Sequence, residues 1–266
     1  MRVLAALILL VVAAVPAMAC GVDSDCELGE RSYRIYLPER KAGEPLGAII
    51  FAHGYRGTAS QVLGDKSLIS LANDLHVALV APQAADGDWQ LPNRPRQRDT
   101  SGAAEFDYFK RLIDDIGKRF GIDRRKLLAT GFSSGGMLVW NLACHEGDLF
   151  AGFAPISGTF WAPVPETCSG PAVSLIHFHG TDDGVVPLDG RKIADAKQGE
   201  VSNALALFTK VGHFGHEHPM PAKDLHCMRR ENPGGKILEF CTHPGGHGYK
   251  ADYVRRAWQE MHIGDR

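Results

Sequence analysis

The segment 131–135 reads Gly-Phe-Ser-Ser-Gly, so a serine stands between two glycines at a fixed spacing. It follows a mostly apolar run, 126–130, and precedes a helix-forming stretch, 136–143. In such a strand–turn–helix context a G-x-S-x-G segment forms a sharp, strained turn. Glycines are needed at its flanks because a Cβ there would collide with the neighbouring strand or helix. The pattern predicts that Ser133 is the nucleophile of an ester-cleaving serine hydrolase.

A serine hydroxyl is a poor nucleophile near neutral pH, so it needs a histidine that accepts its proton and a carboxylate that orients the histidine. After this kind of turn the partners follow in the order acid, then histidine. Asp183 follows the apolar run 173–178 in a turn-rich segment, and Asp182 beside it is the alternative acid. His247 lies in a glycine-flanked loop after the last expected strand. Both positions fall where active sites form in parallel sheets.

The elements that must position these residues alternate along the chain. An amphipathic stripe on 102–120 ends at Gly121, as a helix would. Continuously apolar runs are typical of strands covered on both faces, whereas the polar–apolar alternation of 31–37 indicates a half-buried antiparallel strand. We expect strands at 31–37, 47–52, 77–81, 127–131, 150–156, 173–179 and 236–241, and helices at 67–75, 102–120 and 251–261. This order predicts an α/β fold with a mostly parallel sheet between helices.

Four motifs together resemble a known group of secreted enzymes, the polyhydroxybutyrate depolymerases and feruloyl esterases. They are the opening 31–38 (Arg-Ser-Tyr-Arg-Ile-Tyr-Leu-Pro), the turn 131–136, the segment 179–187 (His-Gly-Thr-Asp-Asp-Gly-Val-Val-Pro) and Gly246-His247. They occur in the family's order, and the similarity covers most of the chain after residue 19. The resemblance implies an α/β-hydrolase fold, no cofactor and no metal. It makes Ser133 the nucleophile, Asp183 rather than Asp182 the acid, and His247 the base.

The tetrahedral intermediate of ester cleavage needs hydrogen-bond donors for its oxyanion. One is expected to be the backbone N–H of Ser134, which follows the nucleophile at the start of a helix. The second is expected from the backbone N–H of Tyr55, because His53-Gly54-Tyr55 matches the His-Gly element of the resembling esterases. His53 and His179 are interpreted as groups that support turns rather than as bases.

Three aromatic residues near strand ends are candidates for contact with the substrate: Trp89, Trp161 and Tyr249. Aromatic side chains there could line an acyl or sugar pocket, and a buried packing role is the alternative for each. The segment 187–230 holds four histidines without a carboxylate that completes a ligand set, so we expect a solvated loop or lid rather than a metal site. Those histidines are His213, His216, His218 and His226.

The first nineteen residues have a basic start, a thirteen-residue apolar run and a small-x-small cleavage site, which predict a signal peptide at 1–19. The run is shorter than the roughly 20 residues needed to span a bilayer. Cys20 directly follows the cleavage site, which leaves a lipoprotein as an alternative. Residues 20–266 are expected to form a single catalytic domain that is secreted or periplasmic.

Six cysteines follow the leader, and an even number in an exported protein favours disulfides. The sequence does not fix their pairing, and proximity along the chain gives the simplest one: Cys20–Cys26, Cys144–Cys168 and Cys227–Cys241. Zinc is the rival explanation, but the chain has no C-x-x-C pair.

The net charge of −2 becomes −3 when Arg2 leaves with the leader, and no basic cluster is present that would recruit nucleic acid or an anionic surface. The expected partner is therefore a small-molecule or polysaccharide-linked ester. Feruloyl or related hydroxycinnamoyl esters of plant polysaccharide are the first expectation, and polyhydroxyalkanoates the second. A serine peptidase is a third, and a non-catalytic carbohydrate-binding protein that retains the hydrolase fold is the alternative from another class.

Overall fold

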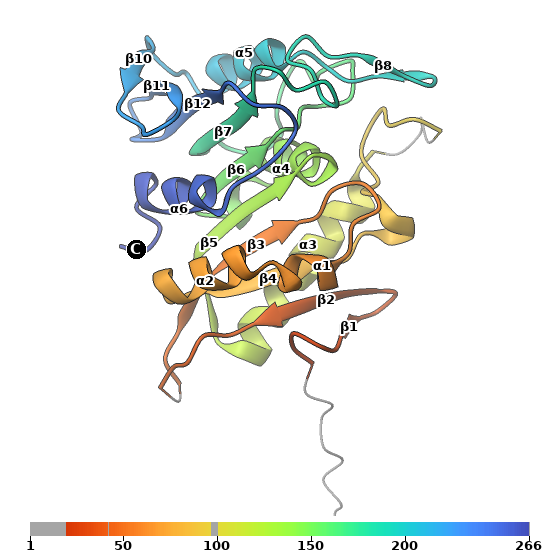
Figure 1. The fold of residues 1–266 in the computed structure, drawn as a ribbon, viewed down its shortest axis with the longest axis vertical. Helices are drawn as coiled ribbons and strands as arrows, with labels where there is room; N and C mark the ends of the chain where they lie inside the picture. The colour runs from red at the N-terminus through yellow and green to blue at the C-terminus, as the bar shows by residue number, and fades with distance from the viewer. Residues whose placement is uncertain (1–19, 42, 97–100, 266) are drawn as a thin grey trace, which may run out of the picture.

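A computed structural model describes residues 20–41, 43–96 and 101–265. The expected signal peptide, 1–19, lies outside the described residues. Ten strands form one sheet that runs from β1 at one edge to β10 at the other (Figure 1). In spatial order the strands are β1 (Cys26–Leu28), β2 (Arg31–Tyr36), β4 (Ala78–Pro82), β3 (Leu46–Ala52), β5 (Ile122–Phe132), β6 (Gly152–Ile156), β7 (Leu175–Gly180), β12 (Ile237–His243), β11 (His226–Glu231) and β10 (His218–Met220).

The centre of the sheet is parallel and its two margins are antiparallel. The strands from β4 through β3, β5, β6 and β7 to β12 pair in parallel. The pairs β1–β2, β2–β4, β11–β12 and β10–β11 are antiparallel. The mostly parallel sheet expected from the sequence is confirmed.

Helices cover both faces of the sheet, and the buried residues form two cores. On β3 the side chains alternate: Ile50 faces one core, whereas Ile49 and Phe51 face the other. One core receives α3 (Ala103–Phe120), α4 (Ser134–His145) and α5 (Val201–Val211), and the other receives α1 (Ala59–Gly64), α2 (Lys66–Leu75) and α6 (Ala251–Glu260). A strand buried on both faces must be apolar throughout, which explains the unbroken run at 46–52.

The sequence of α3 explains both its position against the sheet and the residue at which it ends. Its apolar stripe is buried against the sheet: Phe106, Phe109, Leu112, Ile113 and Ile116. The helix ends where Gly121 adopts a left-handed conformation with φ 65°, and its N–H bonds back to the carbonyl of Gly117. Glycine takes this conformation without the steric penalty that a Cβ imposes.

The strand order changes direction at β3. The chain leaves β3 and returns as β4 on one side, then returns after α3 as β5 on the other side. The loops that follow β3 and β5 therefore leave the sheet in opposite directions, and ligands bind at such points in open α/β sheets. The segment 53–55 and Ser133 lie at these two strand ends.

The prediction of a solvated loop or lid for 187–230 was wrong for most of that segment. It holds α5, the strands β10 and β11, and a small hairpin of β8 (Lys192–Ile193) and β9 (Ala196–Lys197). One side of α5 is buried in the core through Val201, Ala204, Leu207 and Phe208. These buried residues have helical spacing in the sequence, but the histidines in the same segment suggested a loop.

All three predicted disulfides are formed: Cys20–Cys26, Cys144–Cys168 and Cys227–Cys241. Cys227 and Cys241 are direct partners across β11 and β12, so the bond joins two strands shortly before the loop that carries His247. Within the described ranges, no helix is both long enough and apolar enough to cross a bilayer.

Candidate active site

Ser133 sits in a strained turn between β5 and α4. Its φ is 59° and its ψ is −118°, a conformation that costs a non-glycine residue roughly 1–3 kcal/mol. Two backbone hydrogen bonds hold the turn: the Ser133 N–H donates to the Ile156 carbonyl, and the Ser133 carbonyl accepts from the Met137 N–H, both at 2.9 Å. The backbone geometry is that of a nucleophile elbow.

The glycines around Ser133 are enclosed by backbone atoms. A Cβ on Gly131 would lie 2.7 Å from the Gly135 carbonyl carbon and 2.8 Å from the Ala52 carbonyl oxygen. A Cβ on Gly135 would overlap the Ala52 carbonyl and lie 2.7 Å from the carbonyl oxygen of His53. Since these neighbours are main chain, they cannot move aside as a side chain would. The steric reason for the G-x-S-x-G pattern is thus present in the structure.

A carboxylate and an imidazole from distant segments meet beside this turn. Asp183 Oδ2 lies 2.7 Å from Nδ1 of His247. The carboxylate can only accept, so Nδ1 carries the hydrogen and Nε2 of a neutral His247 bears the lone pair. The same carboxylate accepts the N–H groups of Val185 and Val186 through Oδ1, both at 2.8 Å. Asp182, the alternative acid, is exposed.

The Asp183 carboxylate is buried, with no exposed side-chain surface. Burial opposes the charge, but hydrogen bonds from His179, His247 and the two valine amides outweigh it. Together they hold the pKa of Asp183 well below its ordinary value.

The loop that carries His247 passes over the ends of β5 and β6. The rings of His247 and Phe132, the residue before Ser133, have centroids 4.6 Å apart. Ser157 Oγ donates to the Gly248 carbonyl at 3.2 Å. The Ser133 hydroxyl and the His247 ring are not hydrogen-bonded to each other in this arrangement. Such bonds commonly shorten when substrate binds.

The segment 53–55 is held by His53, which is buried. Its Nδ1 donates to the Gly54 carbonyl at 2.8 Å, and its Nε2 accepts from the Ala84 N–H at 3.1 Å. Burial lowers the pKa of His53, which fits this neutral form. Gly54 packs against Ser133, since a Cβ on it would lie 3.5 Å from Cβ of Ser133. The adjacent Tyr55 amide is therefore close to the turn, while its side chain is exposed.

Ser134 stands at the amino end of α4, where backbone N–H groups lack partners within the helix. Its side chain donates to Asp88 Oδ1 at 2.5 Å, and Arg94 lies 3.4 Å from the other oxygen of Asp88. This anchor ties the loop before α3 to the turn. Asp88 was not among the residues expected at the site from the sequence, although an acidic residue directly before Trp89 at a strand end was a usable signal.

The three aromatic candidates occupy different surroundings. Trp89 is only 1% exposed, packs against His53 and Phe109, and donates its indole N–H to the His53 carbonyl at 2.8 Å. Of the two roles expected for Trp89, its position favours packing behind the 53–55 segment. Trp161 is half-buried beside the β8–β9 hairpin, where it pairs with Gln198.

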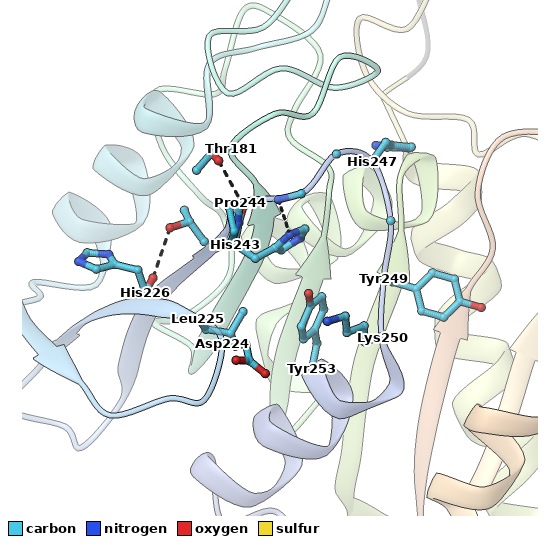
Figure 2. A pocket seen from close by; sticks show the side chains of 14 residues that line it. Thr181, Asp224, Leu225, His226, His243, Pro244, His247, Tyr249, Lys250 and Tyr253 are labelled. Atoms are coloured by element: carbon cyan, nitrogen blue, oxygen red, sulfur yellow. Dashed lines mark hydrogen bonds between the residues drawn. The ribbon is translucent and has the colours of Figure 1, made fainter.

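Tyr249 lies next to a cavity of about 970 Å³ that borders the His247 loop. In Figure 2, His243 and Tyr253 lie together on one side of this loop, and the Tyr249 ring lies on the other. The Tyr249 hydroxyl donates to Asp65 Oδ2 at 2.5 Å, and its ring packs on Phe132. Tyr249 therefore anchors the loop to the start of α2.

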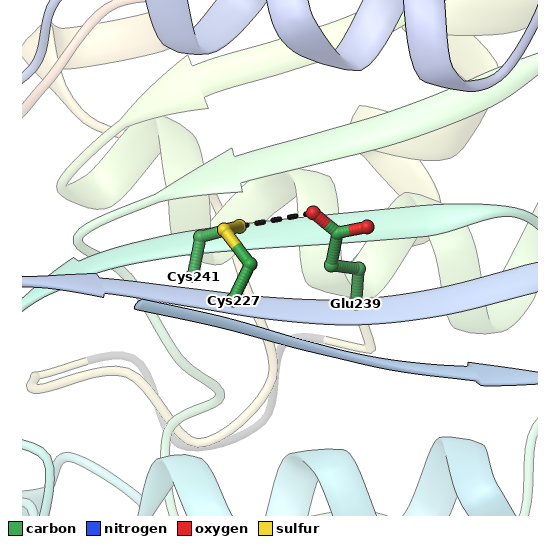
Figure 3. Close-up of side chains that lie close together, drawn as sticks. All are labelled: Cys227, Glu239 and Cys241. Carbon is green, nitrogen blue, oxygen red and sulfur yellow. Dashed lines mark hydrogen bonds between the residues drawn. A yellow bond between two sulfur atoms is a disulfide. The ribbon is translucent and has the colours of Figure 1, made fainter. Parts of the chain in front are cut away.

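One trio of possible metal ligands comes together in the described ranges, namely Cys227, Glu239 and Cys241 (Figure 3). Both sulfurs are joined in a disulfide, so neither is a thiolate ligand. Glu239 is paired with Arg229 and Arg256. The chemistry of this trio fits a structural network rather than a metal centre.

A family model described as "Putative esterase" matches residues 28–212, which is more than half of the chain. The chain belongs to this esterase family. The match includes β2, the elbow and the Asp183 segment, three of the four regions that carried the resemblance in the sequence.

Curated relatives agree with this assignment. The esterase is 27% identical over 242 residues to "Putative esterase NocK" of Nocardia uniformis subsp. tsuyamanensis, covering 82% of this chain and 70% of the relative. It is 25% identical over 241 residues to "Probable feruloyl esterase C" of Aspergillus clavatus, covering 87% and 80%. It is 24% identical over 210 residues to "Feruloyl esterase D" of Neurospora crassa, covering 70% and 68%.

Solved structures confirm the α/β-hydrolase fold of the esterase. The acetyl xylan esterase from Aspergillus awamori superposes with a TM-score of 0.63 at 15% identity, covering 87% of this chain and 94% of that one. An S-formylglutathione hydrolase from Agrobacterium tumefaciens gives a TM-score of 0.58 at 12% identity, covering 89% and 90%. At these identities the likeness concerns the fold alone.

Proposed function

We propose that this esterase is an exported serine hydrolase that cleaves feruloyl or related hydroxycinnamoyl esters of plant polysaccharide through an acyl-enzyme on Ser133. The observation that carries the catalytic part is the hydrogen bond between Asp183 and His247 beside the strained Ser133 turn. The relatives named as feruloyl esterases support the substrate class.

In the proposed reaction, Ser133 Oγ attacks the ester carbonyl while Nε2 of His247 accepts its proton. Asp183 holds the Nδ1–H tautomer and stabilises the imidazolium that forms. The imidazolium then gives its proton to the departing alcohol, which leaves an acyl group on Ser133. Water activated by His247 attacks that acyl group, and the acid is released.

The negative oxygen of each tetrahedral intermediate is proposed to bind the backbone N–H groups of Ser134 and Tyr55. The amino end of α4 favours negative charge because its amides point toward the site. Loss of one such donor typically costs about 2.7–4 kcal/mol of barrier. Asp88 accepts a hydrogen bond from the Ser134 side chain and so holds that residue in place. Trp89 donates to the His53 carbonyl and so holds the segment 53–55.

Export and domain organisation complete the proposal. The three disulfides fit an oxidising compartment, either the periplasm or the medium. We further propose that residues 20–266 act as one catalytic unit after removal of 1–19. Tyr249 and Trp161 are the proposed contacts with the substrate.

The test is turnover of p-nitrophenyl acetate by the wild type, Ser133→Ala and Ser134→Ala. We expect Ser133→Ala to lower kcat by at least about 10³-fold. Ser134→Ala keeps its backbone amide and is the matched control, with a loss of about tenfold or less, as expected for an oxygen that only anchors the turn. Equal rates for Ser133→Ala and the wild type would remove the serine mechanism.

A substrate panel then separates the ester classes. Methyl ferulate, acetylated xylan and hydroxybutyrate oligomers are compared by kcat/KM. We expect methyl ferulate to give the highest value. A preference for the oligomers would replace the proposed substrate with a polyhydroxyalkanoate while leaving the triad intact.

A further inference from the structure

Two buried histidines lie behind Asp183 and take no part in the proposed reaction. His177 and His179 are neighbours on one face of β7, and neither has exposed surface. Nε2 of His177 lies 2.9 Å from Nδ1 of His179. The outer nitrogens face carbonyl oxygens: Nδ1 of His177 is 2.9 Å from Pro155, and Nε2 of His179 is 2.7 Å from Val186.

These contacts fix the number of protons in the pair. A carbonyl oxygen can only accept, so both outer nitrogens must carry hydrogen. The inner nitrogen–nitrogen contact needs a third hydrogen, because two bare lone pairs would repel at 2.9 Å. Two neutral imidazoles carry only two such hydrogens. The pair therefore holds one extra proton and one positive charge.

The surroundings decide which ring carries the charge. His177 packs between Trp140 and Phe240, with ring centroids 5.1 and 5.6 Å away. Burial lowers the pKa of His177 well below its ordinary value, and the neighbouring His179 lowers it further. His179, in contrast, has its Nε2 3.4 Å from Asp183 Oδ2, the same oxygen that binds His247. The counterion of the pair, the Asp183 carboxylate, therefore lies beside His179 and not beside His177.

We propose that His179 is a buried imidazolium, kept protonated by its hydrogen bond to His177, and that it acts as a second cationic partner of the Asp183 carboxylate. This rests on the proposed function, because its effect on the reaction passes through His247. A carboxylate alone stabilises the protonated form of a neighbouring histidine. A cation on the other side of that carboxylate weakens this stabilisation of the protonated form. His247 therefore stays neutral, and able to accept the Ser133 proton, at lower pH values than it would beside the carboxylate alone.

Other groups around the pair are consistent with this arrangement. The titratable groups nearest to His179 are Asp183 from the loop after β7, which also binds His247 from the loop after β12, and His243 at the carboxyl end of β12. The helix α4 and the strand β12 present the apolar rings of Trp140 and Phe240. Burial, followed by the positive charges of Lys250 and His179, lowers the pKa of His243, and Asp183 opposes this shift. His177 and His179 are thus positioning residues for the proposed acid.

The first experiment counts protons without using activity. Histidine ring nitrogens are labelled with ¹⁵N in the wild-type protein, and their protonation is followed by NMR from pH 5 to pH 8, with His177→Phe and His179→Phe for assignment. We expect both ring nitrogens of His179 to stay protonated at pH 7 and His177 to keep one bare nitrogen. A neutral His179 at pH 7 would overturn the proposal, whatever the enzyme hydrolyses.

The second experiment tests the consequence for catalysis. His177→Phe removes the acceptor for Nδ1 of His179 but retains a ring of similar shape against Phe240. His179 can then be neutral and still donate to Val186. We expect the acid limb of the kcat/KM profile on p-nitrophenyl acetate to move up by about one pH unit. The matched control is His145→Phe, at the far end of α4, which should leave the profile in place.

The two experiments separate the possible failures. An unchanged acid limb in a folded His177→Phe variant would overturn the effect on His247, because a purely structural role lowers the rate without moving the profile. If Ser133→Ala keeps its activity, the proposed function fails while the NMR count still decides the state of His179. If His177→Phe does not fold, the wild-type NMR count decides the proposal.

Discussion

The turn that carries Ser133 and the loop that carries His247 are held in place by different kinds of contact. Around Ser133, backbone atoms of neighbouring segments surround the backbone of the turn, so a Cβ on Gly131 or Gly135 would have no room. On either side of His247 there is more room: a Cβ on Gly246 would lie 3.6 Å from the Asp182 carbonyl oxygen, and a Cβ on Gly248 would have no atom within 4 Å. That loop is held by side chains instead, through Asp183, Ser157 and Tyr249.

This difference separates two requirements of the proposed mechanism. The nucleophile needs an unusual backbone conformation, which only close steric packing maintains. The base needs one tautomer and freedom to reorient between accepting and returning a proton, which hydrogen bonds to side chains allow. The Ser133 turn should therefore be most sensitive to substitutions that add volume. The His247 loop should be most sensitive to substitutions that remove polar groups.

The largest effect is expected from the polar anchor of the loop. Asp183→Asn should lower kcat by about 10⁴-fold, because an amide no longer enforces the Nδ1–H tautomer of His247. The matched control is Asp182→Asn, whose side chain is exposed and which should keep nearly the wild-type rate. Steady-state kinetics on p-nitrophenyl acetate measure both. The opposite result would assign the acid to Asp182.

Added volume in the turn is expected to have the next largest effect. Gly135→Ala places a Cβ against the carbonyls of Ala52 and His53 and should lower the free energy of unfolding by at least about 3 kcal/mol. Gly248→Ala adds the same methyl group to the loop and should change the free energy of unfolding by less than about 0.5 kcal/mol. Urea unfolding compares the two. Similar losses would mean that the turn and the loop are enclosed to the same degree.

A third prediction concerns acid stability. Because the pKa of Asp183 in the folded state is below its ordinary value, its ionised form stabilises the fold above pH about 4, and this contribution is lost as the pH falls further. The wild type should thus be more stable than Asp183→Asn at pH 7, and the difference should shrink toward pH 3. Urea titrations at several pH values measure it. A difference that stays constant with pH would contradict the depressed pKa.

The smallest effect is expected at the outer anchor of the loop. Tyr249→Phe removes the hydrogen bond to Asp65 and should cost about 1 kcal/mol of unfolding free energy. The control Tyr36→Phe removes an exposed hydrogen bond to Asn73 and should cost less. Thermal unfolding compares the two variants. A larger loss for Tyr36→Phe would show that Tyr249 does not anchor the loop.

Most of the sheet was predictable because its central strands are buried on both faces and their apolar runs are short and well separated. The same pattern located β3, β5 and β7 within a few residues. The antiparallel margin formed by β10 and β11 was missed because β11 carries charged side chains such as Arg229, which is buried only because Glu239 and Glu260 pair with it. A partner supplied by a different segment leaves no local signal.

The sequence by itself determined the turn at Ser133, since the need for glycine at 131 and 135 comes from local backbone geometry and the next strand. Proximity along the chain also suggested the disulfide pairs that the structure forms, but it did not fix them. Only the tertiary structure decided which carboxylate meets His247, that Trp89 is buried behind the 53–55 segment, and that 201–211 joins the core. It also brought His177, His179 and Asp183 together. Such hydrogen bonds join strands and loops across the sheet, and their geometry exists only after the core has packed.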